Sequence, residues 1–194
     1  MKHFLLFLPF VLLFAACSKD EFDPSKPKAG QVVELFVDHY RTGSDSRLFL
    51  NTDRKNSLGT YVDKFDQREI GYTYVIKAKV VVAPSNLMDA PSYWFEYVRT
   101  VETEKYKGQD TFALPLFGFL APSEVFFLRK DTDKYYYRNY LLSPADATVQ
   151  ADLAEALEKG PGMLTAAGPR SITLYVKHDP DNYGKGYVVY RVAL

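Results

Sequence analysis

The chain has 194 residues, 24 Lys and Arg against 24 Asp and Glu, and a single cysteine. This length suits one domain or two small ones, with a core large enough to be stable without disulfides or structural metal ions. The balanced charge argues against a protein that grips nucleic acid through a basic surface. One thiol excludes an internal disulfide and a cysteine-rich metal site.

The first 16 residues have the layout of a bacterial secretory signal peptide. Lys2 provides a basic start, an apolar run covers residues 4–14, and two small residues precede Cys17. The run is far shorter than the roughly 20 residues that anchor a helix in a bilayer, and its layout is typical of a cleaved signal. Removal of Lys2 with the signal leaves 23 basic against 24 acidic side chains.

Phe14-Ala15-Ala16-Cys17 resembles a lipobox, with Phe where Leu is usual. The resemblance implies that Cys17 receives a diacylglyceryl group, becomes the new N-terminus and is acylated there. More than one acyl chain is needed for stable anchoring, so we expect the mature protein to meet the membrane through lipid on Cys17. The alternative is an ordinary secreted protein with an incidental cysteine.

The residues after the cysteine indicate where in the cell envelope the protein is delivered. Ser18-Lys19-Asp20-Glu21 is similar to the lysine-plus-acidic tag that sends Bacteroidetes lipoproteins to the outside of the outer membrane. That resemblance favours the cell surface over the periplasmic face. The alternative is a solvated charged linker, and we expect residues 17–30 as a whole to form a flexible tether.

The rest of the chain reads as strands separated by turns. Tyr72–Val82 shows the clearest period-two alternation, which is typical of a half-buried strand. In chain order the expected strands cover residues 32–40, 47–51, 61–65, 72–82, 93–106, 112–119, 124–129, 134–142, 171–178 and 187–194, the last two as a hairpin.

One helix is expected near residues 147–159. Val149, Leu153 and Leu157 repeat every four residues on one face, and Gly160-Pro161-Gly162 is expected to end it. One helix among many strands predicts an all-β, mainly antiparallel sandwich or barrel. We expect a β-domain at 31–108, with 109–194 as a β-rich part packed on it or as a second module.

The span from Leu35 to Tyr106 resembles the DUF4377 family, a small uncharacterised domain of bacterial lipoproteins and secreted proteins. The motifs that carry the resemblance are Leu35–Tyr40, Gly71–Lys77, Asn86 and Asp89–Tyr93, followed by Phe95, Tyr97 and Val101. The family's frequent cysteines are missing, and Gln67–Ile70 replaces its acidic-proline step. The resemblance implies an exported β-architecture and brings no catalytic residue or ligand.

No pattern of catalytic or metal-ligating residues stands out, so no metal or other cofactor is expected. Leu35–His39 is echoed by Leu174–His178, which could mark a repeat. Two histidines and a carboxylate would suffice for a catalytic zinc, but neither has a second ligand at helical or hairpin spacing. Asp179–Gly184 has the first, third and sixth positions of a calcium loop, but Tyr183 stands at the fifth and Tyr190 at the twelfth, so a turn explains it better.

Two aromatic clusters, represented by Trp94 and Tyr136, could stack on a glycan or protein ligand, although consecutive strand residues point to opposite faces. Two hypotheses therefore stand. The first is a non-enzymatic, lipid-anchored envelope protein with a binding or structural β-domain. The second is an envelope hydrolase or metal-dependent enzyme that uses His39 and His178.

Overall fold

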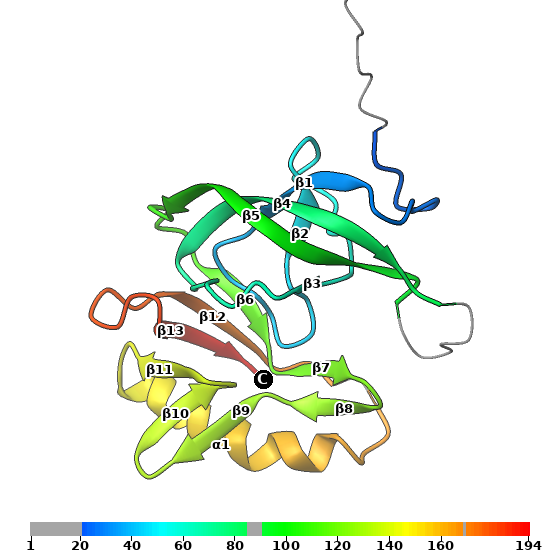
Figure 1. Cartoon of the computed structure of the whole chain (residues 1–194). Helices are drawn as coiled ribbons and strands as arrows, with labels where there is room; N and C mark the ends of the chain where they lie inside the picture. The colour runs from blue at the N-terminus through cyan, green and yellow to red at the C-terminus, as the bar shows by residue number, and fades with distance from the viewer. Residues whose placement is uncertain (1–20, 85–90, 169) are drawn as a thin grey trace, which may run out of the picture.

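The computed structural model describes residues 21–84, 91–168 and 170–194. The expected signal peptide, Cys17 and Ser18-Lys19-Asp20 lie outside these ranges. The described chain is mainly β with one α-helix, which confirms the predicted fold class. Figure 1 shows two sheets lying one above the other, with the helix on the side of the second sheet that faces away from the first.

The first sheet has five strands in the order β2-β1-β4-β5-β3. The alternation in β4 is confirmed, because Tyr74, Ile76, Ala78 and Val80 are buried in the core of this sheet. The long hairpin β4–β5 forms its centre and pairs Tyr72 with Lys105 at one end and Val82 with Tyr93 at the other. The strands are β1 (Val32–Val37), β2 (Leu48–Leu50), β3 (Val62–Asp63), β4 (Tyr72–Val82) and β5 (Tyr93–Lys105).

The second sheet has six strands in the order β6-β12-β13-β11-β10-β9. The predicted hairpin near the C-terminus is confirmed as the antiparallel pair β12–β13, and β11 pairs with β13 in parallel. The strands are β6 (Phe112–Pro115), β9 (Leu128–Asp131), β10 (Lys134–Tyr137), β11 (Tyr140–Pro144), β12 (Thr173–His178) and β13 (Gly186–Ala193).

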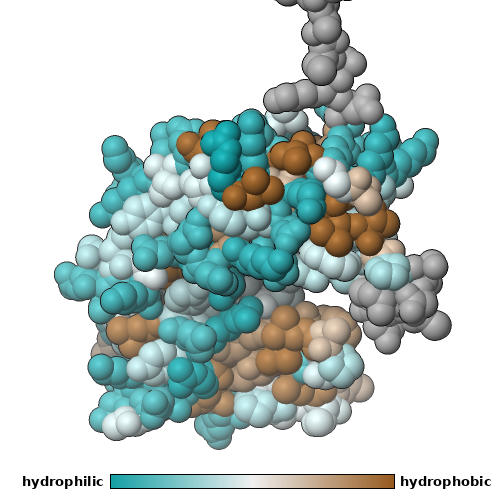
Figure 2. Space-filling model, viewed as in Figure 1, coloured by the Kyte–Doolittle hydropathy of each residue, from teal (hydrophilic) through white to brown (hydrophobic). Residues whose placement is uncertain are grey.

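A separate two-stranded ribbon consists of β7 (Phe117–Leu120) and β8 (Ser123–Phe126). The predicted strand at 112–119 is thus two strands with a bend at Leu116, because the first pairs with β12 and the second pairs with β8. Figure 2 shows a mostly hydrophilic face with apolar side chains gathered around this ribbon. Phe119 is 61% exposed and Leu120 is 39% exposed.

Helix α1 (Ala147–Met163) begins where the sequence predicts and ends later. Asp146 caps it by accepting a hydrogen bond from the N–H of Val149. The expected stop at Gly160-Pro161-Gly162 is wrong, because the helix continues through all three residues. Gly160 is buried there, and a Cβ on it would lie 2.1 Å from the ring of Phe126. This packing keeps the last turn helical although glycine and proline disfavour a helix.

The N-terminal segment corrects the expected flexible tether. Phe22 is only 7% exposed and packs edge-on against the rings of Tyr93 and Phe95 in the first core. Gly30 donates its N–H to the carbonyl of Val80. An aromatic side chain that reaches a core gains more by burial than the chain loses in freedom. The ordered domain therefore begins by Phe22.

Candidate functional site at the seam between the sheets

A loop from the first sheet crosses to the second and forms the seam between them. It follows β1 and covers residues 38–47. Gly43 donates its N–H to the hydroxyl of Tyr137 at 2.5 Å, and its carbonyl accepts a hydrogen bond from Arg138 at 2.7 Å. A Cβ on Gly43 would lie 1.8 Å from the ring of Phe127. Only glycine fits here, so the second sheet fixes the position of this loop.

Arg68 fixes the same loop from the side of the first sheet. Its guanidinium donates to the backbone carbonyls of Asp38, Tyr40 and Ser46 at 3.2, 2.9 and 2.8 Å. These acceptors carry no net charge, and the Asp38 carboxylate offsets the cation only in part. Burial and the neighbouring Arg41 cation lower the pKa of Arg68 to about 10.

Tyr183 closes the seam at its other end. Its hydroxyl lies 2.5 Å from the carbonyl oxygen of Gly71 and 2.9 Å from that of Tyr106. Gly71 has a φ of +85°, and a Cβ there would lie 2.6 Å from the ring of Tyr183. Because Tyr183 belongs to the turn between β12 and β13, this contact joins the C-terminal hairpin to the end of β5.

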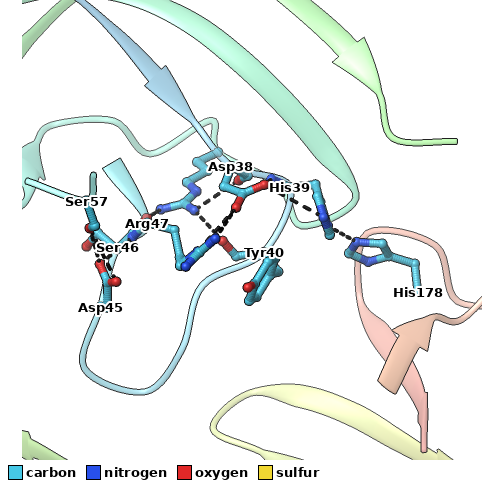
Figure 3. Close-up of polar contacts among 9 residues, drawn as sticks. Asp38, His39, Tyr40, Asp45, Ser46, Arg47, Ser57 and His178 are labelled. Atoms are coloured by element: carbon cyan, nitrogen blue, oxygen red, sulfur yellow. Dashed lines mark hydrogen bonds and ion pairs between the residues drawn. The ribbon is translucent and has the colours of Figure 1, made fainter. Parts of the chain in front are cut away.

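The two echoed histidines meet at this seam. Nδ1 of His39 lies 2.8 Å from Nε2 of His178, and Figure 3 shows the rings pointing toward one another from the ends of β1 and β12. Tyr106 stacks on His39 at a centroid distance of 3.5 Å, and Phe112 packs against both imidazoles. Burial lowers the pKa of each histidine to about 4, so both are neutral near pH 7.

The hydrogen bonds around this pair favour one arrangement of protons. Nδ1 of His178 is buried with no partner in the described ranges. An unpaired acceptor is tolerated better than an unpaired N–H, so His178 carries its proton on Nε2 and donates it to His39. Nε2–H of His39 then faces Oδ1 of Asp38, 3.7 Å away. Asp38 in turn accepts from Arg47.

A cavity of about 290 Å³ opens beside this loop. Arg41 and Arg68 both line it, and Arg41 lies over the ring of Tyr140 at 5.7 Å. The buried Nε of Arg41 has no hydrogen-bond partner in the part of the chain that is described. The remaining lining residues are Ser46, Leu48, Val62, Phe65, Asp66 and Ile70. Two guanidinium groups thus share one small cavity that draws its walls from both sheets.

The residues singled out in the sequence fall in different places. Of the expected export tag only Glu21 lies in the described part, where it is exposed next to Phe22. Trp94 and Tyr136 are half-buried and lie in different sheets. Trp94 stacks parallel to Tyr61 at 6.3 Å, and the Tyr136 ring is covered by Arg129 at 4.3 Å. They do not form one platform.

The histidine pair does not extend to a metal-binding set in the described ranges, where no three His, Cys, Asp or Glu side chains are placed to hold an ion. Asp179, which the sequence places in a turn, accepts hydrogen bonds from Ser143, Asp181 and Asn182. It organises the turn between β12 and β13, as a buried Asp does in an Asx-turn.

Sequence reasoning missed Arg41, Arg68 and Tyr183. Each of these residues lies in a polar segment whose sequence contains no recognisable functional motif. The usable signal was Gly71, where the close approach of the Tyr183 ring excludes a Cβ; no comparable signal marks Arg41 or Arg68.

The chain matches no protein-family model, no curated protein and no solved structure to which it was compared. Within the described ranges, no helix is long and apolar enough to cross a membrane. The resemblance to DUF4377 therefore stays an expectation.

Proposed function

We propose that the protein is a lipid-anchored protein of the outer membrane, at the cell surface rather than on the periplasmic face. Its β-domain binds or supports other molecules without catalysis. The burial of Phe22 carries the proposal. Only residues 18–21 separate it from Cys17, so at full extension the core would lie within ~18 Å of the lipidated residue. Such a short link suits a domain held against a membrane surface.

Labelling with a palmitate analogue tests the anchor. The protein expressed in a Bacteroidetes host should incorporate the label and fractionate with the outer membrane, whereas Cys17→Ser should lose the label. A matched control is Ser18→Ala, which keeps the thiol. Absence of label from the wild-type protein would reject the anchor.

Protease treatment of intact cells tests the membrane face. A surface protein is cleaved without permeabilisation, and replacement of Lys19, Asp20 and Glu21 by Ala should protect it if these residues direct export. Protection of the wild-type protein until the outer membrane is opened would place it on the periplasmic face.

The binding role is supported by the cavity at the seam. Its lining comes from the loop after β1, from the segment before β4 and from Tyr140 of β11. Small-molecule sites favour concave junctions at which a few polar groups converge, and the exposed lining of this cavity is mainly polar. The half-buried Trp94 and the exposed Tyr61 form a second, separate surface on which a glycan could stack.

A metal-dependent enzyme or hydrolase that uses His39 and His178 is the second candidate. The 2.8 Å contact between the imidazoles favours it, because two such nitrogens could turn toward one ion. Their aromatic surroundings and the missing third ligand in the described ranges weigh against it. Calorimetric titration with Zn²⁺ tests this candidate. Zinc binding that is lost in His39→Gln would support a metal-dependent enzyme, and absence of zinc binding would reject a zinc-dependent one.

A further inference from the structure

We propose that the cavity at the seam binds a small organic anion through its carboxylate or phosphate group, with Arg41 and Arg68 as the cationic contacts. This inference deepens the binding role proposed above and rests on it. It does not depend on the lipid anchor.

Arg41 is the first reason. A guanidinium has five N–H donors, and Arg41 has neither a hydrogen bond nor an ion pair to any residue in the described ranges, while its Nε is buried. Its guanidinium lies over the Tyr140 ring, 5.7 Å from the ring centroid. A buried donor without an acceptor is costly. An oxyanion in the cavity would supply the missing acceptor.

Arg68 is the second reason. Its hydrogen bonds use three of its five N–H donors, all on neutral carbonyls. The low pKa of Arg68 reflects burial next to the Arg41 cation. Two cations that disfavour one another are stabilised together by an anion between them.

The nearby carboxylates do not fill this role. Asp38 is paired with Arg47 at 2.8 Å. Asp66 lines the cavity but is exposed, and it forms no salt bridge with either arginine. The cationic pair therefore faces a space that the described chain leaves without an opposite charge at bonding distance.

The shape and lining define the class of ligand. Ser46 and Tyr140 line the cavity together with the two cations, whereas Leu48 and Ile70 are almost fully buried at its wall, so the exposed lining is mainly polar. A volume of about 290 Å³ admits only a small molecule. Arginine recognises carboxylate and phosphate through paired N–H groups. The ligand is thus a compact anion.

Calorimetric titration of the purified full-length protein at constant ionic strength tests the inference, with benzoate and inorganic phosphate as separate probes. Wild-type protein should bind at least one of them. Arg41→Gln should weaken the affinity by about tenfold or more, since a hydrogen bond to a charged group is lost. Asp66→Asn should strengthen it by removal of a repelling charge. Binding of benzoate alone assigns a carboxylate, and binding of phosphate alone assigns a phosphate group.

Arg99→Gln is the matched control, because it removes one exposed positive charge that lines none of these walls. It should leave the affinity within about twofold, as expected for a screened distant charge. Equal weakening in Arg41→Gln and Arg99→Gln, or no binding of either probe at millimolar concentration, would overturn the inference. Arg41 makes no hydrogen bond, so its variant should fold, and an unchanged unfolding midpoint verifies this. If the wild-type protein binds neither anion but still incorporates the palmitate label, the proposed anion site is rejected and the proposed lipid anchor stands.

Discussion

His39 and His178 stand 139 positions apart and share a hydrogen bond of 2.8 Å between Nδ1 and Nε2. His39 lies just after β1 and His178 ends β12, and the two strands share an inward pattern, because Leu35, Val37, Leu174 and Val176 are all fully buried. The two strands belong to different sheets. The echo in the sequence therefore corresponds to two strand ends that meet, and the histidine pair links the sheets in its neutral form.

Acid should weaken this link. Each histidine has a folded pKa of about 4, below its ordinary value of 6.5, because burial disfavours the imidazolium. Between these values the unfolded chain binds more protons than the folded one. The contribution of the histidines to the free energy of unfolding is therefore greatest above pH 6.5 and falls as the pH drops toward 4. The loss at pH 5 is on the order of 2 kcal/mol per histidine. Urea unfolding at several pH values measures it.

Removal of the titrating groups provides the control. His39→Gln and His178→Gln lower stability at pH 7, yet their free energy of unfolding should vary less between pH 6.5 and 4.5 than that of the wild type. Asp38 and Arg47 face His39 and remain in both variants. An unchanged pH dependence would show that the pair does not titrate in this range.

Gly71 and Tyr183 should be energetically coupled. Gly71→Ala meets a strained φ of +85° and the Tyr183 ring at 2.6 Å, so we expect a loss of at least ~2 kcal/mol. Gly30→Ala isolates the strain, because Gly30 has a φ of +82° and open space around a Cβ. Gly71→Ala should cost clearly more than Gly30→Ala, and Tyr183→Ala should remove part of the difference. Strictly additive losses in chemical denaturation would contradict the coupling.

The fold was predictable where local pattern and burial agree. Tyr72–Val82 is a strand with the bounds that its alternation indicates, since one face of it supplies core residues and the other, apart from the buried Val75, is partly or fully exposed. Residues 134–142 read as one strand but form the hairpin β10–β11. Arg138 adopts a φ of 56° there and donates its N–H to Phe127. That turn depends on a tertiary hydrogen bond, which no local propensity contains.

The site was less predictable for the same reason. The histidines stood out because they end matching strands, but their contact depends on how the two sheets pack. Arg41 and Arg68 have the sequence surroundings of ordinary solvated cations, and only the loop at 38–47 brings them into one cavity. Phe22 lies among Asp, Pro, Ser and Lys, so its burial against Tyr93 follows from a contact across 71 positions.

The two glycines near the end of α1 should respond to alanine in opposite directions. Gly162→Ala meets open space, so it should stabilise the helix by about 0.5–1 kcal/mol. Gly160→Ala places a Cβ 2.1 Å from the Phe126 ring, and the cost of overpacking, about 1–3 kcal/mol, should exceed the gain in helix propensity. Thermal unfolding compares them. A stabilising Gly160→Ala would show that the Phe126 ring moves aside freely.

Replacement of Phe22 tests whether the domain begins next to the membrane anchor. Phe22→Ala should lower the free energy of unfolding by about 3 kcal/mol, the cost of removing a buried aromatic ring. Phe22→Leu, which keeps most of the apolar volume, should cost less than half as much. Glu21→Ala is the control, because Glu21 is exposed and adjacent, and it should change stability by less than ~0.5 kcal/mol. If Phe22→Ala leaves the unfolding midpoint unchanged, the segment is a flexible tether after all. If it has the expected effect, the first core residue lies five positions after Cys17, and a lipid on that cysteine would hold the domain against the membrane.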